Sequence, residues 1–166
     1  MFTNLISVIV LFIADRVFKI AAVKYFSDEL TVLIPGFIGI KVLEGGNTGA
    51  AFGILSGNTE LLAALSAVVS VVLLIILILN RFDRDSERWG YILVCAGAIG
   101  NLYDRLIEKS VTDYLEFLFI DFPVFNFADV LVDVGCLLLF INIFFFDKPK
   151  KQVHIETETS EENEEI

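Results

Sequence analysis

The chain has 166 residues, of which 56% are hydrophobic and 20% are charged, and its mean hydropathy is +0.75. Its 16 Phe residues and long Val, Ile and Leu runs offer more apolar surface than a soluble domain of this length can bury, which argues against a soluble enzyme and indicates a membrane protein. Six of the 22 acidic residues, all Glu, lie in the last eleven positions; the other 16 acids face 12 bases, a net charge of −4, so no basic surface for nucleic acid remains.

Four segments are long and apolar enough to cross a bilayer core about 30 Å thick as helices of roughly 20 residues. The cleanest, Leu61–Leu79, carries no charge and lies between Glu60 and Arg81. The other three carry charged residues toward one end only. In chain order, the four predicted spans are residues 2–23, 61–79, 89–107 and 127–146. We therefore expect a mainly α-helical membrane protein with four transmembrane helices.

The orientation of these spans follows from the basic residues in the short loops, which favour the cytoplasm. Three arginines separate the second and third spans, and three lysines follow the fourth. They are Arg81, Arg84 and Arg88, and Lys148, Lys150 and Lys151. This places both termini in the cytoplasm and residues 24–60 and 108–126 outside. The first span lacks a basic start and small cleavage-site residues, so it is not a cleaved signal peptide. We expect one membrane domain, residues 1–151, followed by a disordered acidic cytoplasmic tail, residues 152–166.

The two outer segments differ in pattern. Residues 24–60 contain Pro35, several glycines and the β-branched or alternating stretches 31–34 and 37–42. This pattern predicts a small β-rich segment between the first two helices, lying on the membrane surface. The second outer segment is aromatic and apolar between its charges over residues 114–125. That pattern predicts an interfacial helix or turn with its rings at the level of the lipid headgroups.

Charged and amide side chains gather toward the outer ends of three predicted spans. Within each span two of them are four residues apart and share one helix face. The pairs are Asp15 with Lys19, Asn101 with Arg105, and Asp129 with Asp133, and Asp104 lies beside the second pair. Ionisable groups that face lipid are costly, so these faces should point at one another. Interfacial anchoring or simple ion pairing is an open alternative, above all for Arg16, Lys19 and Asp133.

Residues that are missing narrow the chemistry. The one histidine, His154, lies in the tail, so a Ser-His site and His-ligated zinc are not available. Cys95 and Cys136 fall in apolar runs and indicate neither a disulfide framework nor a metal cluster. A Ser-Lys dyad is disfavoured because no serine accompanies a lysine at the outer ends. A pair of carboxylates that share one proton and activate water, as in aspartic proteases, fits the remaining groups.

Five sequence motifs, in this order along the chain, resemble those of the bacterial lipoprotein signal peptidase family, the type II signal peptidases. They are DRVFK (15–19), NTGAAF (47–52), GAIGNLYDR (97–105), VTDY (111–114) and FNFAD (125–129). With the four spans, the resemblance covers residue 1 to about residue 147. Two departures are visible: Arg16 stands where the family usually has Gln, and Ala96 where it often has Gly.

The resemblance implies that Asp113 and Asp129 are the catalytic aspartates. It implies supporting or substrate-binding roles for Asp15, Lys19, Asn47, Gly100, Asn101, Asp104, Arg105, Asn126 and Ala128. It further implies an enzyme of the bacterial cytoplasmic (inner) membrane, with its active site at the outer leaflet, that cleaves prolipoproteins before a diacylglyceryl-modified cysteine. Membrane lipids and a peptide inhibitor of the globomycin type are implied partners, and no cofactor or metal is implied.

Two functions of other classes fit parts of the pattern. A small four-span proton-coupled transporter could use Asp15 or Asp129 as a proton relay. It has no need, however, for a second carboxylate in an outer loop or for a strand-rich outer segment. A structural or lipid-binding membrane protein would use the polar groups only to pack its helices together.

Overall fold

The computed structural model of the chain describes residues 1–49, 54, 55 and 57–146. These residues form four α-helices and three short strands. The helices are α1 (Phe2–Tyr25), α2 (Thr59–Leu79), α3 (Asp85–Ile107) and α4 (Phe127–Ile141), which a π-helical turn, η2 (Asn142–Phe146), extends. The strands are β1 (Thr31–Ile34), β2 (Ile38–Ile40) and β3 (Leu115–Phe117). The predicted acidic tail, the three lysines after the fourth span and residues 50–52 of the second motif lie outside the described residues.

The helix bounds agree with the four predicted apolar segments to within a few residues. The largest difference is at the start of α3, which begins at Asp85 and not at Trp89. Its first turn contains Asp85 and Glu87, whose negative charges favour a helix N-terminus, so helix formation continues beyond the apolar run.

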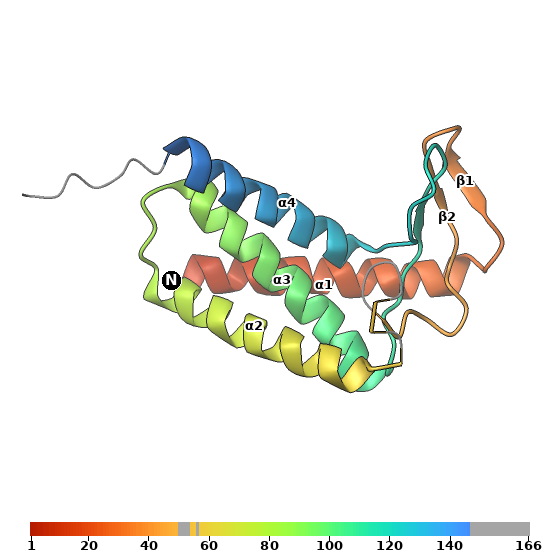
Figure 1. Ribbon diagram of the computed structural model, residues 1–166, viewed down its shortest axis with the longest axis horizontal. Helices are drawn as coiled ribbons and strands as arrows, with labels where there is room; N and C mark the ends of the chain where they lie inside the picture. Colours follow the sequence, from red (N-terminus) through yellow and green to blue (C-terminus); the bar gives the residue numbers. More distant parts are fainter. Residues whose placement is uncertain (50–53, 56, 147–166) are drawn as a thin grey trace, which may run out of the picture.

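Helix α3 lies at the centre of the bundle and packs against each of the other three (Figure 1). Its contact with α4 is close because small residues face each other there: a Cβ added to Gly135 of α4 would lie 2.8 Å from the carbonyl oxygen of Gly90 in α3. The apolar core between the helices includes Val8, Leu77, Ile92 and Leu131. Cys95 is buried in it, whereas Cys136 is exposed; both are free thiols.

Two helical stretches, α2 and the run Phe127–Phe146, are long and apolar enough to cross a membrane by length and composition. Helices α1 and α3 carry charged residues, and three of these point into the bundle: Asp15 and Asp104 are fully buried and Lys19 is 2% exposed. Large apolar side chains such as Phe2, Ile9 and Ile20 cover the outer surface of α1. The four-span arrangement stays a prediction, and burial of the charges removes the main objection to it.

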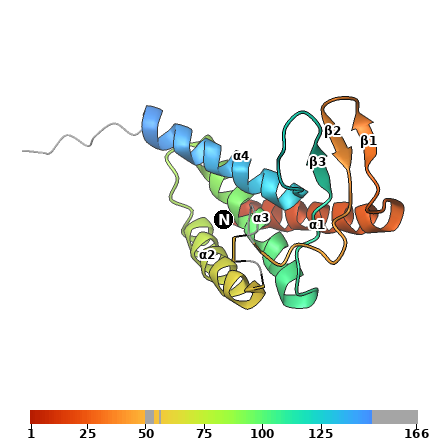
Figure 2. The ribbon, with the colours of Figure 1, turned by 45° about the vertical axis from the view of Figure 1, so that its right-hand side comes forward.

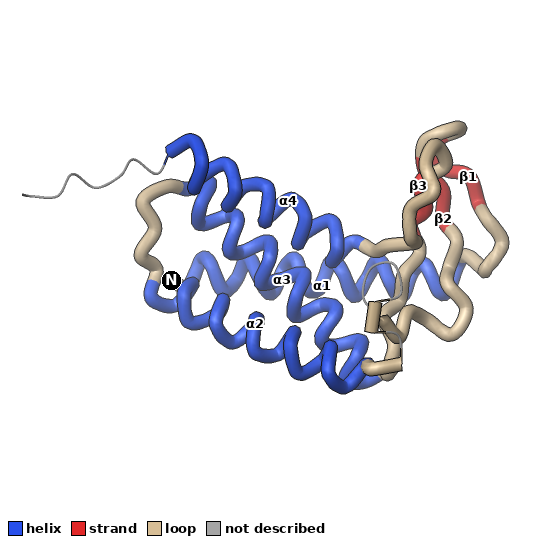
Figure 3. The backbone as a smooth tube through the Cα atoms, viewed as in Figure 1, coloured by secondary structure: helices blue, strands red, loops and turns tan. Residues whose placement is uncertain are grey.

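The three strands form an antiparallel sheet of order β1-β2-β3 at one end of the bundle (Figures 2 and 3). The first two strands come from the predicted β-rich segment, which confirms that prediction. The third strand corrects the prediction of an interfacial helix or turn in residues 114–125, because Ile38–Ile40 pairs with Leu115–Phe117. Aromatic residues favour strands where they pack across one, and the ring of Phe117 lies 4.8 Å from that of Phe125.

The two ends of the bundle differ in composition. The N-terminus, the loop between α2 and α3 and the end of η2 lie at one end, whereas the sheet and the C-terminal end of α1 lie at the other (Figure 1). The basic residues Arg81, Arg84 and Arg88 are therefore at the end opposite the sheet. This arrangement is the one that the predicted alternation of the four spans requires.

Candidate functional site

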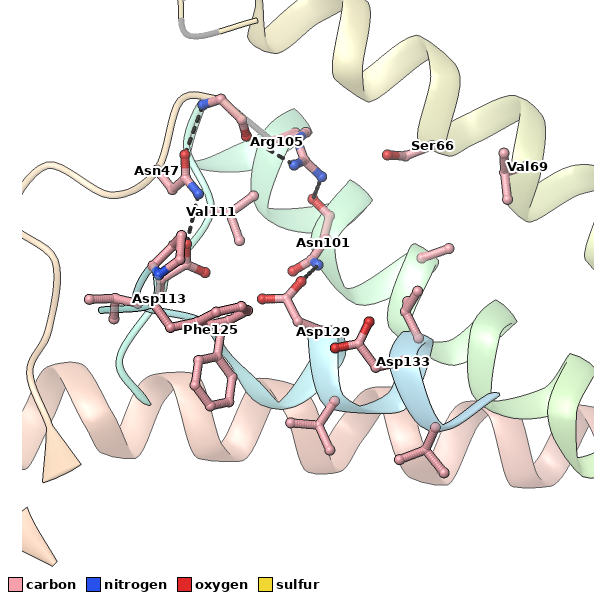
Figure 4. Close-up of a pocket in the computed structure, with 18 of the residues that line it drawn as sticks. Asn47, Ser66, Val69, Asn101, Arg105, Val111, Asp113, Phe125, Asp129 and Asp133 are labelled. Carbon is pink, nitrogen blue, oxygen red and sulfur yellow. Dashed lines mark hydrogen bonds between the residues drawn. The ribbon is translucent and has the colours of Figure 1, made fainter. Parts of the chain in front are cut away.

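A cavity of about 630 Å³ opens between α2, α3 and α4, next to the two outer segments. Asp113, from the segment before β3, and Asp129, from the first turn of α4, both line it (Figure 4). Asn47, Asn101 and Arg105 complete its polar side, and apolar residues such as Val69 and Phe125 form the rest of its wall. The cavity thus brings together carboxylates from two parts of the chain in a mostly apolar surround.

Asn126 joins the two carboxylates. It is the N-cap of α4, where its side-chain oxygen accepts a hydrogen bond from the Asp129 N–H (3.1 Å), and its own N–H donates to Asp129 Oδ2 (3.0 Å). Its side-chain Nδ2 donates to Asp113 Oδ1 (2.6 Å). The capping box that starts the helix therefore also fixes the positions of both carboxylates.

Asp113 is 2% exposed, and two side-chain amides hold it. Asn126 binds one carboxylate oxygen, and Asn47 Nδ2 donates to the other at 2.9 Å. Backbone hydrogen bonds between Asn47 and Val111 (2.7 and 2.8 Å) tie the segment that carries Asn47 to the segment that carries Asp113. Burial, together with the nearby charge of Asp129, raises the pKa of Asp113 to about 6. The carboxyl group thus exchanges its proton near neutral pH.

Asp129 is held from the other side of the cavity. Asn101 Nδ2 donates to Asp129 Oδ1 at 2.7 Å. The side-chain oxygen of Asn101 in turn accepts from Lys19 Nζ (3.0 Å) and from Asn126 Nδ2 (3.2 Å). The ammonium group of Lys19 therefore acts on Asp129 through the amide of Asn101, which it orients and polarises.

Behind this amide lies a buried group of two acids and two bases. Arg16 donates to Asp104 Oδ1 and to Asp15 Oδ2, and its guanidinium lies 4.8 Å from the centre of the Tyr103 ring. Lys19 Nζ lies 3.2 Å from Asp15 Oδ2 and 2.9 Å from Asp104 Oδ2. The four charges sum to zero, so these two bases are neutralised by Asp15 and Asp104. Asp113 and Asp129, which face the cavity, form no ion pair with them.

This ion cluster is also connected to both outer segments. The backbone N–H of Ala128 donates to Asp15 Oδ1 (3.1 Å), and that of Thr112 donates to Asp104 Oδ2 (3.1 Å). Gly100 lies against the cluster: an added Cβ would be 2.7 Å from Asp15 Oδ2 and 3.3 Å from the Cβ of Ala128. Only a residue without a side chain lets α1, α3 and α4 approach this closely.

Arg105 lies at the outer edge of the cavity and is bonded weakly. Its guanidinium nitrogens lie 3.5 Å from the carbonyl oxygen of Asn101 and 3.4 Å from that of Gly49, and its Nε has no partner among the described residues. The charges of Asp113 and Asp129 both act on it. A guanidinium with such long bonds is available for a stronger acceptor that enters the cavity.

The structure brings together all the residues that the sequence singles out. Asp113 and Asp129 line the cavity with Asn47, Asn101 and Arg105; the others, Asp15, Lys19, Gly100, Asp104, Asn126 and Ala128, support them from behind. Arg16, for which interfacial anchoring or simple ion pairing was left open, pairs with Asp15 and Asp104 in the ion cluster. The α2 wall, Leu65, Ser66 and Val69, was not predicted; Ser66, one of two serines in the apolar run 61–79, was the available signal. The described residues contain no group of three or more His, Cys, Asp and Glu side chains that could hold a metal ion.

Comparison with known proteins gives a consistent result. The family model described as Signal peptidase (SPase) II matches residues 7–145. A lipoprotein signal peptidase of Clostridium tetani is 37% identical over 144 residues, which cover 84% of this chain and 91% of that protein. One of Nostoc punctiforme is 37% identical over 140 residues, covering 84% and 87%.

Two solved structures have the same fold. Both are described as bacterial membrane enzymes determined by the in meso method. The one at 2.3 Å resolution has a TM-score of 0.80 and 27% identity and covers 92% of this chain and 95% of its own. The one at 1.9 Å has a TM-score of 0.72 and 28% identity and covers 89% and 96%.

Proposed function

The chain belongs to the signal peptidase II family, and on that premise we propose that it is an aspartic endopeptidase that removes signal peptides from diacylglyceryl-modified prolipoproteins. The family makes it a membrane protease of lipoprotein maturation. The observation that carries the catalytic proposal is the pair of buried carboxylates, Asp113 and Asp129, joined through Asn126 at one cavity.

In the proposed reaction, Asp113 and Asp129 share one proton, because two adjacent carboxylates in a desolvated site do not both ionise. The ionised carboxylate takes a proton from a water molecule as the water oxygen attacks the carbonyl carbon of the scissile bond. The protonated carboxyl group donates its proton to the carbonyl oxygen. When the carbon–nitrogen bond breaks, the carboxyl group formed from the first carboxylate gives its proton to the amine of the lipidated cysteine. A hydroxyl group of the tetrahedral intermediate returns its proton to the other carboxylate as the new carboxyl product forms, so the dyad again holds one proton.

The supporting residues act on this pair by position and charge. Asn47 and Asn126 hold Asp113, and Asn101 holds Asp129, so each carboxylate keeps its orientation without a direct cationic partner. Neutral amide partners let one carboxyl group stay protonated, which a directly bonded lysine would prevent. Arg105, with its weak hydrogen bonds, is placed to bind a carbonyl oxygen of the substrate.

We further propose that all four helices cross the bacterial cytoplasmic (inner) membrane, with both termini in the cytoplasm. The basic loop between α2 and α3 and the N-terminus lie at the same end, as the preference of basic loops for the cytoplasm requires. The site then lies at the outer leaflet, where the scissile bond of an exported prolipoprotein arrives. Exposed apolar residues of β1, such as Val32 and Ile34, favour contact of the sheet with the membrane surface.

The cavity supports the proposed substrate in its shape and lining. It lies between α2 and α4, which both pack on α3 but not closely on each other. A signal peptide can therefore reach the carboxylates sideways from the membrane, while the acyl chains of the modified cysteine stay among the lipids. A peptide inhibitor of the globomycin type would occupy the same cavity. Residues 152–166 have no part in this chemistry.

Incubation of the purified protein with a diacylglyceryl prolipoprotein tests the proposal. The expected result is that the substrate loses the mass of its signal peptide. Asp113→Asn and Asp129→Asn should each lower the rate of this cleavage by about a thousandfold or more while the proteins remain folded. Full turnover by both variants would contradict the dyad. A pH gradient across proteoliposomes tests the transporter alternative, which family membership does not support: a transporter would collapse the gradient in the presence of its substrate.

A further inference from the structure

Asp133 is a carboxylate in the cavity wall that the proposed reaction does not use. It follows Asp129 by four residues on α4, so the two side chains share one face of the helix. Asp133 is exposed and lines the cavity. Figure 4 shows it beside Asp129, with Ser66 and Val69 of α2 across the cavity. The cavity therefore holds a third carboxylate, on the side away from the outer loops.

The basic side chains of this region are bonded to other groups. Arg16 and Lys19 pair with the buried carboxylates of α1 and α3, and Arg105 binds two backbone carbonyl oxygens. The side chain of Asp133 has no ion pair or hydrogen bond within the part of the chain that the structure describes. Its surroundings on the wall are apolar, with Val130 and Val134 on its own helix. An ionisable side chain without a partner at such a place marks a path for a polar ligand.

The position of Asp133 relative to Asp129 fixes which part of a substrate it would meet. Four residues of α-helix rise roughly 6 Å, so Asp133 lies about that far from Asp129 toward the end of the bundle that holds the N-terminus. In the proposed function and orientation, the signal segment of the substrate lies on this side of the scissile bond. An extended chain covers about 6 Å in two residues and a helical one in four. Asp133 therefore faces the substrate two to four residues before the cleaved bond.

We propose that Asp133 determines substrate specificity by accepting a hydrogen bond from a hydroxyl side chain of the signal segment at one of these positions. This inference rests on the proposed function. A hydroxyl group fits because it is small and donates a hydrogen bond, and because Ser66 across the cavity leaves the position polar on both sides. An apolar side chain there offers the carboxylate no hydrogen-bond donor, so the enzyme discriminates against it.

Paired substrates test this directly. Thr and Val have nearly the same shape and differ in one hydroxyl group, so each pair of lipidated substrates carries Thr or Val at position two, three or four before the scissile bond. We expect the wild-type enzyme to favour Thr over Val by about tenfold in kcat/KM at one of these positions. Asp133→Asn keeps an acceptor oxygen and retains most of the preference. Asp133→Val, which matches the neighbouring valines, removes or reverses it.

Each outcome decides the inference separately from the proposed function. Wild-type enzyme that cleaves both members of every pair at equal rates overturns the specificity role of Asp133, whatever the variants do. The role is also overturned if Asp133→Val and Asp133→Ala keep the wild-type preference for Thr. It is overturned as well if both variants cleave neither substrate, because Asp133 would then be needed for cleavage itself. Wild-type enzyme that cleaves no lipidated substrate at all contradicts the proposed function. Asp28→Val removes an exposed carboxylate outside the cavity and should leave the preference unchanged.

Discussion

Asn126 and Asp129 bind each other twice: the Asn126 side chain accepts from the Asp129 N–H at 3.1 Å, and the Asp129 side chain accepts from the Asn126 N–H at 3.0 Å. The same Asn126 side chain donates to Asp113. The residues that start α4 are thus the residues that hold the two carboxylates, so stability of the helix end and geometry of the site depend on one side chain.

Asn126→Ala is therefore expected to reduce both stability and activity. Loss of the cap costs about 1 kcal/mol of unfolding free energy, and loss of the hydrogen bonds to Asp113 and Asn101 brings the cost to roughly 2 kcal/mol. Because Asp113 loses a 2.6 Å hydrogen bond that orients it, kcat/KM should fall by about a hundredfold. Thermal unfolding in detergent and cleavage of a lipidated substrate measure the two effects.

Asn142→Ala provides a matched control at the other end of the same helix. Asn142 is also buried and hydrogen-bonded, donating to the Leu138 carbonyl and accepting from Ser86. Its loss should reduce stability by about 1 kcal/mol and leave kcat within about twofold. An equal loss of activity in the two variants would show that Asn126 acts only through stability.

The raised pKa of Asp113 predicts that the stability of the protein depends on pH. Its folded-state pKa of about 6 is above the ordinary value of 3.8, because burial and the charge of Asp129 favour the protonated form. The folded protein therefore binds this proton more tightly than the unfolded chain does between these two values. The contribution of Asp113 to the free energy of unfolding is at most roughly 3 kcal/mol. It is fully present below pH 3.8, falls as the pH rises, and is lost above about pH 6.

Asp113→Asn isolates this effect, since the amide keeps the size of the side chain and does not titrate. We expect the unfolding temperature of the wild-type protein to fall relative to that of Asp113→Asn between pH 4 and pH 6 and the difference to be constant above that range. Parallel curves for the two proteins across the range would mean that the Asp113 pKa is not raised in the folded state.

Much of this site could be predicted from the sequence, for a physical reason. Charges in apolar helices have few low-energy placements, so Asp15, Lys19, Asp104 and Asp129 had to converge. Asp113 lies in a short loop with no periodic pattern, and its role came from the resemblance alone. Strand β3 was missed because its three residues, Leu115–Phe117, carry too little pattern to separate a strand from an interfacial helix; pairing with β2, more than 70 residues earlier, decides it.

An Arg16→Gln variant is expected to reveal an asymmetry within the ion cluster. In Arg16→Gln, Lys19 still contacts both Asp15 and Asp104, so the site keeps its geometry. Stability should fall by about 1–2 kcal/mol through the lost ion pairs and the lost contact with Tyr103, while kcat/KM stays within about threefold.

Lys19→Met is the contrasting change in the same cluster. Like Arg16→Gln, it leaves Asp15 and Asp104 with one cation, but Met cannot donate a hydrogen bond to them as Gln can, and the hydrogen bond to Asn101 is lost as well. We therefore expect a loss of about 3–5 kcal/mol in stability and of about a hundredfold in kcat/KM. Unfolding midpoints and single-turnover rates on one lipidated substrate compare the two variants. A larger activity loss in Arg16→Gln than in Lys19→Met would contradict the path from Lys19 through Asn101 to Asp129.

The orientation of the chain in the membrane gives the last prediction. Glu29 and Asp83 are both exposed and lie in loops at opposite ends of the bundle: Glu29 between α1 and β1, and Asp83 between α2 and α3. In a Cys136→Ala background, which removes the exposed native thiol, Glu29→Cys should react with a membrane-impermeant thiol reagent added to intact cells, and Asp83→Cys only after the cells are opened. The reverse labelling pattern would put Asp113 and Asp129 at the cytoplasmic face. An exported prolipoprotein would then present its scissile bond on the wrong side of the membrane, and the proposed function would lose its physical basis.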